Sequence, residues 1–216
     1  MSPKYEARGP EAEFEPGSRG RVLRNLLGIT RVRDMNEAES QALELAQEAA
    51  LDQFAQDHRF TTDDIRTLHR LWLGAIYPWA GDYRNVNIDK GGFQFAHAPL
   101  IAGLMEELER GALRRNTPCR AGSDTAVARA LAEVHAELIL VHPFREGNGR
   151  LARLLALLMA LQAGLPPLDF GPLSGRGKHL YIGAIHAAVG RDYEPLSGMF
   201  ARVIERTRRR AASNWQ

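Results

Sequence analysis

The sequence has little cysteine and no long apolar run. Cys119 is the single cysteine among 216 residues, so no disulfide can form within the chain. It lies in a polar stretch, NTPCRAGSD, without a C-x-x-C or metal-ligand spacing. The longest apolar run, LLALLMALQAG, is too short to cross a bilayer, and the first twenty residues hold no apolar signal-peptide core. We therefore expect a cytoplasmic protein that does not enter a membrane.

Neither sign of charge dominates, because 28 Lys and Arg residues stand against 26 Asp and Glu residues. A chain so balanced does not attract nucleic acid through its overall field, so nucleic-acid binding is not the expected function. One basic run, ERTRRR at residues 205–210, is the exception. Its cations suit the C-terminal end of a solvated helix. A docking patch for DNA or another partner is the alternative interpretation of this run.

The chain shows no repeat, no low-complexity tract and no linker, which favours one all-α domain with a short hairpin attached. Helical periodicity predicts helices over residues 36–55, 61–77, 99–115, 124–142, 149–163, 178–190 and 194–207. Between them, YRNVNIDKGGFQFAH alternates apolar and polar residues around Gly91-Gly92, the pattern of a β-hairpin. We predict a flexible N-terminal arm over residues 1–20, a single domain over 21–210 and a C-terminal tail over 211–216.

The segment HPFREGNGRLAR, His142 to Arg153, interrupts the helical sequence with charged residues and glycines. Pro143 and Gly147 predict a tight loop, after which a helix begins at Gly-Asn-Gly. The unsatisfied N–H groups and the dipole of that helix start suit an anion. Arg150 and Arg153 are three residues apart on this helix, so both can face the same anion. Two guanidinium groups and a helix start fit a polyphosphate better than a single carboxylate.

Two further side chains of this segment suggest a reaction. Glu146 beside bound phosphates makes sense if a Mg²⁺ ion lies between the carboxylate and the phosphate oxygens. His142 can take up a proton near neutral pH. Together these parts predict transfer of a group from a nucleoside triphosphate to a hydroxyl that His142 deprotonates.

The segment resembles the signature of Fic-domain proteins: His-x-Phe-x-Asp/Glu-Gly-Asn-Gly-Arg-x-x-Arg, with every defining position present. WAGDYRNVNIDKGGFQF resembles the Gly-x-x-Arg segment of this family and the flap hairpin that follows it. PGSRGRVLRNLLGIT and GRDYEPLSGMF resemble the two ends of small bacterial members. The resemblance thus covers residues 16–205, and it implies a Fic-type helical bundle with a short β-hairpin flap over the active site.

The resemblance also implies a role for each motif residue. His142 would be the catalytic base, Glu146 would hold Mg²⁺, and Phe144 would anchor the loop. The phosphates would be bound by Gly147, Asn148, Gly149, Arg150 and Arg153, and Tyr181 would contact adenine. The flap would pair with an extended segment of the target and position its hydroxyl; its residues are Lys90, Gly91, Gly92, Phe93 and Phe95.

The implied activity is that of a protein adenylyltransferase, which transfers AMP from ATP to a Ser, Thr or Tyr hydroxyl of a target protein. Gly149 favours this reaction, because the branch of the superfamily that phosphorylates its target carries lysine at the corresponding position. The motif fixes the phosphates and not the base, so transfer of UMP or another phosphate-containing group stays open. So do a non-catalytic nucleotide-binding module and a DNA-binding regulator.

Many Fic proteins carry an inhibitory helix with the pattern Ser/Thr-x-x-x-Glu-Gly/Asn. Ser40 and Glu44 have this spacing, but Leu45 follows them and the pattern is incomplete. The resemblance therefore implies the toxin of a toxin-antitoxin pair, with the inhibitory helix on a small antitoxin. Family analogy favours a bacterial topoisomerase subunit as the target, or a host small GTPase if the protein is exported.

Several residues outside the motif are expected to have structural and not catalytic roles. We expect Arg84 to tether the base of the flap and His135 to pack within its helix. Trp72 and Trp79 are expected to fill the core near the flap. The histidines His69, His97, His179 and His186 do not have the spacing of metal ligands.

Overall fold

Two compact units make up the described chain, and each combines stretches that are far apart in the sequence. The computed structural model describes residue 11 and residues 13–120, 122–173 and 175–213. Unit 1 comprises the described residues up to Phe54 together with Thr62–Glu106 and Val141–Leu151. Unit 2 comprises Ala55–Thr61, Glu107–Leu140 and the described residues from Ala152 onward. The prediction of a single domain over residues 21–210 stays a prediction.

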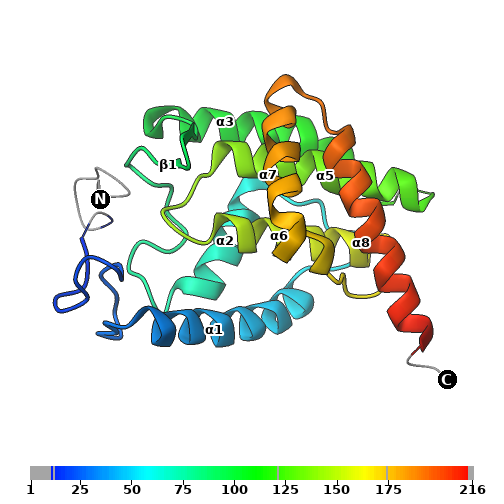
Figure 1. Cartoon of the computed structure of the whole chain (residues 1–216). Helices are drawn as coiled ribbons and strands as arrows, with labels where there is room; N and C mark the ends of the chain where they lie inside the picture. The colour runs from blue at the N-terminus through cyan, green and yellow to red at the C-terminus, as the bar shows by residue number, and fades with distance from the viewer. Residues whose placement is uncertain (1–10, 12, 121, 174, 214–216) are drawn as a thin grey trace. The chain divides into compact units, whose positions relative to one another are not determined.

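Unit 1 is helical apart from one hairpin. Its elements are α1 (Val32–Gln53), α2 (Thr62–Leu73), β1 (Asp89–Lys90), β2 (Phe93–Gln94), the 3-10 turn η2 (Ala98–Leu100), most of α3 (Ile101–Leu108) and the first turn of α6 (Asn148–Gln162). Helices α1 and α2 lie side by side (Figure 1). The buried residues of α1 recur at helical spacing and are Met35, Glu39, Ala46 and Ala50. An acid therefore occupies a position on this stripe where an apolar residue would be expected.

The hairpin forms at the glycine pair, as the alternating sequence predicts. Strands β1 and β2 are antiparallel, with Lys90 opposite Phe93. Gly91 and Gly92 have φ angles of 62° and 82°. Positive φ at both central residues is the requirement of a two-residue hairpin turn whose twist matches its strands. The N–H of Phe95 donates to the carbonyl of Ile88 at 3.2 Å, which continues the pairing one step toward the hairpin base.

Helix α2 is shorter than the sequence predicts, since it ends at Leu73 and not at Pro78. The chain tightens after Gly74, a poor helix former. The N–H groups of Ile76 and Tyr77 both donate to the carbonyl of Leu73, at 2.9 and 2.8 Å. Residues 74–77 therefore form turns instead of a last helical turn.

The regular elements in the described part of unit 2 are all helical. Its elements are the π-helical turn η3 (Glu109–Leu113), α4 (Arg114–Asn116), most of α5 (Asp124–Val141), the remainder of α6, the 3-10 turns η4 (Gly171–Leu173), η5 (Gly175–Gly177) and η6 (Ala188–Gly190), and the helices α7 (Lys178–Ala187) and α8 (Glu194–Ser213). Helices α7 and α8 pack side by side (Figure 1). The core includes Leu131, Met159, Phe200 and Val203, all fully buried.

The start of α5 and the end of α6 each have a residue type that favours a helix boundary. Ser123 precedes α5, and its Oγ accepts the N–H of Ala126 at 3.2 Å, as expected of an N-cap. Gly164 follows α6 with φ of 75°, and the N–H of Leu165 returns to the carbonyl of Ala160 at 3.0 Å. Glycine suits this left-handed position because it has no Cβ.

The described part of the predicted arm makes local contacts, and the described part of the predicted tail is helical. Residues 1–10 and 12 of the arm, and residues 214–216 of the tail, lie outside the described part. Glu11 and Ser18 are buried, and Phe14 pairs with Leu23 through an isolated antiparallel bridge. These contacts join the described part of the arm to the residues that follow it, and the flexibility of the arm stays a prediction. Helix α8 includes the first three residues of the predicted tail.

Among the described residues, none of the helices combines the length and the apolar character needed to span a bilayer.

Candidate active site

His142 lies directly after α5 in a left-handed backbone conformation, with φ of 51°. This conformation commonly ends a helix, and for a residue other than glycine it costs about 1 kcal/mol. The strained turn directs the chain from α5 into the motif loop. The ring of Phe95, which follows β2, stacks on the His142 imidazole with a centroid distance of 3.7 Å and an interplanar angle of 18°. The flap residue Phe95, predicted to position the target, therefore contacts the proposed base itself.

Arg84 connects the flap to the loop that carries His142. Its Nε donates to the carbonyl of His142 at 2.7 Å, and its backbone N–H donates to the carbonyl of Pro143 at 2.8 Å. Its two terminal nitrogens donate to the carbonyls of Val86 at 2.5 Å and Ala96 at 2.6 Å, on either side of the hairpin. Arg84 is only 2% exposed. A single buried guanidinium thus fixes both ends of the flap and the backbone of the histidine, in agreement with the expected tethering role.

The motif loop is closed by the side chain of Asn148. Its Oδ1 accepts the N–H of Phe144 at 2.9 Å, and its Nδ2 donates to the carbonyl of the same residue at 2.7 Å. Asn148 is buried, so its amide shapes the loop. Phe144 is fully buried and stacks on His69 at 3.9 Å. Both side chains therefore determine the shape of the loop.

His69 on α2 also supports the loop. Its Nδ1 accepts the N–H of Gly81 at 2.8 Å, so the ring proton resides on Nε2, which donates to the carbonyl of Glu146 at 3.2 Å. Burial lowers the pKa of His69 to about 4, so the ring is neutral at pH 7. His69 is a structural support of the motif, a role that the sequence did not suggest.

The two glycines of the motif differ in how much space lies beside them. Gly147 has φ of 84°, and a Cβ at this position would lie 2.6 Å from Trp72 Cζ3. Gly149 is different, because no described atom other than those of its chain neighbours and the nearby backbone of its own helix lies within 4 Å of the position that its Cβ would take. No described residue accepts a hydrogen bond from the backbone N–H of Asn148 or Gly149. The first turn of α6 therefore presents N–H donors beside open space.

Glu146 and Arg150 flank this helix start. Glu146 Oε1 accepts the N–H of Gly147 at 2.9 Å and lies 3.7 Å from Arg150 Nη2. The Arg150 guanidinium lies over the ring of Trp72, with 4.7 Å between Cζ and the ring centroid. The same guanidinium forms an ion pair with Glu39 of α1 at 2.6 Å. A carboxylate and a guanidinium are thus held beside the open space at Gly149.

Arg153 and Tyr181 belong to unit 2, whereas the motif residues from His142 to Arg150 belong to unit 1. Within α6, Arg153 follows Arg150 by three residues, so the helix places both on one face. The Tyr181 hydroxyl is hydrogen-bonded to Nε2 of His135 at 2.9 Å. Burial raises the pKa of Tyr181 to about 12, and the positive charge of Arg153 opposes that shift. His135 is therefore packed within unit 2 and engaged with Tyr181.

The tip of the flap is open to solvent. Lys90, Gly91 and Gly92 are exposed, and Phe93 is partly buried with its ring edge-on to that of Phe95 at 5.2 Å. A two-stranded hairpin has unpaired backbone groups on its outer edges, where an extended segment can pair. The flap residues are therefore positioned as an edge that could take up another strand.

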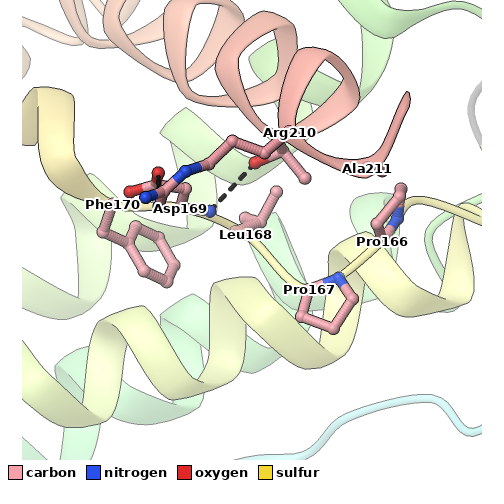
Figure 2. Close-up of a pocket in the computed structure, with 8 residues that line it drawn as sticks. Pro166, Pro167, Leu168, Asp169, Phe170, Arg210 and Ala211 are labelled. Atoms are coloured by element: carbon pink, nitrogen blue, oxygen red, sulfur yellow. Dashed lines mark hydrogen bonds and ion pairs between the residues drawn. The ribbon is translucent and has the colours of Figure 1, made fainter. Parts of the chain in front are cut away.

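A hollow in unit 2 lies outside the motif. It has a volume of about 560 Å³ and is lined by residues of the loop after α6 and the end of α8 (Figure 2). The Asp169 carboxylate accepts a hydrogen bond from Arg206 Nε at 2.6 Å and also pairs with Arg210. These arginines, Arg206 foremost, lower the pKa of Asp169 to about 2. None of the lining residues belongs to the motif, and the ion pairs join the loop to α8.

The basic run at residues 205–210 is engaged in ion pairs within the chain. Besides the pairs with Asp169, Arg208 pairs with Asp124 at 2.7 Å and Arg209 pairs with Glu205 at 3.3 Å. Acidic partners reduce the positive field that a DNA-binding patch would need. The contacts agree with the interpretation of this run as the solvated end of a helix.

The comparisons with known proteins agree with the motif. Residues 59–160 match the model of the Fic/DOC family. The chain is 31% identical over 162 residues to protein adenylyltransferase VbhT of Bartonella schoenbuchensis, an alignment that covers 74% of this chain and 33% of the relative. It is 28% identical over 183 residues to the probable protein adenylyltransferase y4lH of Sinorhizobium fredii, covering 85% of this chain and 91% of the relative.

A solved structure shares the fold. The ADP-bound N-terminal Fic domain of a putative cell filamentation protein from Bartonella quintana superposes with a TM-score of 0.73 at 23% identity, covering 91% of this chain and 95% of that one. The predicted all-α fold with a hairpin is confirmed. The chain contains a Fic/DOC family domain. It spans about a quarter to a third of the length of the first curated relatives that it matches.

Proposed function

We propose that this chain is a protein adenylyltransferase, which transfers AMP from ATP to a Ser, Thr or Tyr hydroxyl of a target protein. The main observation in support of this proposal is that the complete motif places N–H donors, Arg150 and Glu146 around the open space at Gly149. Two relatives bear the name of this activity, VbhT and, as a probable member, y4lH. The Bartonella quintana domain of the same fold has bound ADP, which supports a nucleotide as the ligand.

The side chains at the site fit a single Mg²⁺ ion. Glu146 supplies a hard carboxylate, and the described residues contain no cluster of three or more His, Cys, Asp or Glu side chains that could enclose a metal. Mg²⁺ commonly takes one or two protein carboxylates and completes its shell with phosphate oxygens and water. Glu146 would hold the ion, which when bound would neutralise the charge of the phosphates.

His142 would act as the general base. The target hydroxyl gives its proton to the imidazole while its oxygen forms a bond to the α-phosphorus. The bond from the α-phosphorus to the bridging oxygen breaks, and pyrophosphate leaves. The N–H groups at the start of α6 would stabilise the α-phosphate, while Arg150 and Arg153 hold the terminal phosphates. Arg84 and Phe95 would keep the imidazole in place through the contacts described above.

The flap would position the hydroxyl. An extended segment of the target pairs with the edge of the hairpin through backbone hydrogen bonds, which are available whatever the side chains of the segment. Because Arg84 joins the flap to the carbonyl of His142, a segment paired with the flap is held at a set distance from the base. Tyr181 of α7 would contact adenine.

Inhibition in trans is the second part of the proposal. Glu44, which has the spacing of an inhibitory glutamate, is exposed on α1, and its pattern is incomplete. We therefore assign the inhibitory helix to a separate small antitoxin and this chain to the toxin of the pair. A bacterial topoisomerase subunit is the proposed target, and the cytoplasm, which suits a chain with one buried thiol, is the proposed compartment.

The test uses the purified chain with Mg²⁺ in bacterial lysate, supplied with ATP labelled at the α-phosphate or at the γ-phosphate. A protein band labelled only from the α-phosphate, and lost in His142→Ala, is the expected result. A band from the γ-phosphate would establish phosphorylation and contradict the proposal. If α-labelled UTP labels the band and α-labelled ATP does not, the transferred group is UMP and not AMP. Nucleotide binding without any transfer, even after Glu44→Gln, would identify a non-catalytic module.

A further inference from the structure

Glu39 is a buried acid on α1 whose three oxygens each receive a contact. Its Oε2 lies 2.6 Å from Arg150 Nη2, and its Oε1 accepts the hydroxyl proton of Tyr77 at 2.7 Å. Its backbone carbonyl accepts the indole N–H of Trp72 at 2.8 Å. The Glu39 side chain is only 5% exposed. The carboxylate is therefore fixed in place and cannot reach far from its present partners.

Trp72 holds the same guanidinium from a second direction. Its ring lies under Arg150 at 4.7 Å, and it also occupies the space beside Gly147. Glu39 binds one terminal nitrogen of the guanidinium while Trp72 supports the face of the group. A guanidinium has five N–H donors, so this arrangement leaves donors for another acceptor. The Arg150 side chain is 29% exposed, so a ligand can reach them.

We infer that Glu39 is a positioning residue, which orients Arg150 toward the terminal phosphates of a nucleotide bound at the start of α6. The inference rests on the proposed function, since it concerns the same site. A free arginine would have to lose side-chain entropy when the nucleotide binds. An arginine that Glu39 and Trp72 already hold has lost this side-chain entropy on folding, so nucleotide binding costs less entropy.

A carboxylate near a phosphate site could instead compete with the phosphates for Arg150. The geometry favours orientation over competition for two reasons. Arg150 stays 29% exposed while its Nη2 is paired with Glu39, and Tyr77 and the packing of α1 against α2 keep the carboxylate inside unit 1. The two roles predict opposite effects of removing the charge, so they can be distinguished by measurement.

The experiment measures the Kd of ATP and of AMP, each with Mg²⁺, by calorimetry on the full chain. Glu39→Gln keeps the size of the side chain and removes its charge, and the expected result is ATP affinity about tenfold weaker with AMP affinity unchanged. Glu44→Gln is the matched control, because Glu44 is exposed on the same helix and should leave both affinities unchanged. In the background of Arg150→Ala, Glu39→Gln should cause no further loss.

Each other outcome overturns the inference. Equal weakening of ATP and AMP would mean a general structural role, and tighter ATP binding would mean competition. If the wild type binds ATP and Glu39→Gln binds it with the same affinity, the inference is wrong and the proposed function stands. A wild type that binds no ATP would remove both. If Glu39→Gln does not fold, Tyr77→Phe tests the same point, with an expected selective loss of about threefold for ATP.

Discussion

Gly147→Ala tests whether the motif loop has its shape because Trp72 occupies the space beside it. The substitution adds one methyl group and introduces no charge or polarity. It acts in two ways, because φ at Gly147 is 84° and the new Cβ would lie 2.6 Å from Trp72 Cζ3 and 2.9 Å from Cη2. Both contacts are well inside van der Waals distance, and the indole is held by its hydrogen bond to Glu39.

The expected cost follows from these two effects. A left-handed backbone costs a residue with a Cβ about 1 kcal/mol. Overpacking against a fixed ring costs about 1 to 3 kcal/mol more. We therefore expect Gly147→Ala to lower the free energy of unfolding by about 3 kcal/mol. In a chain of this length, that corresponds to a fall in Tm of about 6 to 12 °C.

Thermal unfolding followed by circular dichroism measures the change, and Gly149→Ala is the matched control. Gly149 is two residues away, inside α6, and no described atom lies near the position of its Cβ. Its substitution should leave Tm unchanged or raise it slightly, since alanine favours helix by about 1 kcal/mol over glycine. The same substitution should weaken ATP binding, because the methyl group enters the space proposed for the phosphates.

An unchanged Tm for Gly147→Ala would refute the reasoning. So would equal losses in the two glycine variants, because only Gly147 faces a fixed ring. A further check combines Gly147→Ala with Trp72→Leu. If the overlap with the indole causes the loss, the double variant should be more stable than the sum of the two single effects.

Two further predictions concern buried groups around the loop. For His69, the folded pKa of about 4 lies below the ordinary value of 6.5, so the unfolded chain binds the proton first as pH falls. Protonation of this group should lower the free energy of unfolding by about 3 kcal/mol as the pH falls from 6.5 to 4. Urea titrations at several pH values measure it, and His69→Gln should show a shallower pH dependence of this free energy. The exposed control His179→Gln should show the same pH dependence as the wild type. Arg84→Lys should cost about 3 kcal/mol or more, because one ammonium cannot reach the carbonyls of His142, Val86 and Ala96 together; urea unfolding measures it, and a loss below about 1 kcal/mol would contradict the tethering role.

The features that the sequence predicts are local ones. The motif occupies twelve consecutive residues, so its spacing can be read directly. The hairpin turn needs two residues with positive φ between segments in which apolar and polar residues alternate. The pair Gly91-Gly92 meets this need and can be recognised in the sequence. The predicted ranges of the helices over residues 124–142 and 149–163 likewise rest on short patterns and lie close to α5 and α6.

The residues that support the motif were not predictable in this way. Glu39 is one of several glutamates on α1, and only its contact with Arg150, more than a hundred residues later, distinguishes it. His69 is a single histidine on an amphipathic helix, which is the pattern of an ordinary core residue. The amide of Asn148 closes the loop by bonding to the backbone of Phe144, a contact that the spacing of the motif does not reveal. Such pairings are set by tertiary packing, which periodicity and spacing do not report.

The attachment of the flap has a consequence for how new target preferences could arise. Arg84 binds the carbonyls of Val86 and Ala96, so the base of the hairpin is clamped independently of its tip. Exposed side chains of the tip, such as Lys90, can be exchanged without moving that base, while Gly91 and Gly92 supply the positive φ angles of the turn. The tip is therefore a place where recognition can diversify, by evolution or by grafting, while the geometry around His142 is inherited unchanged.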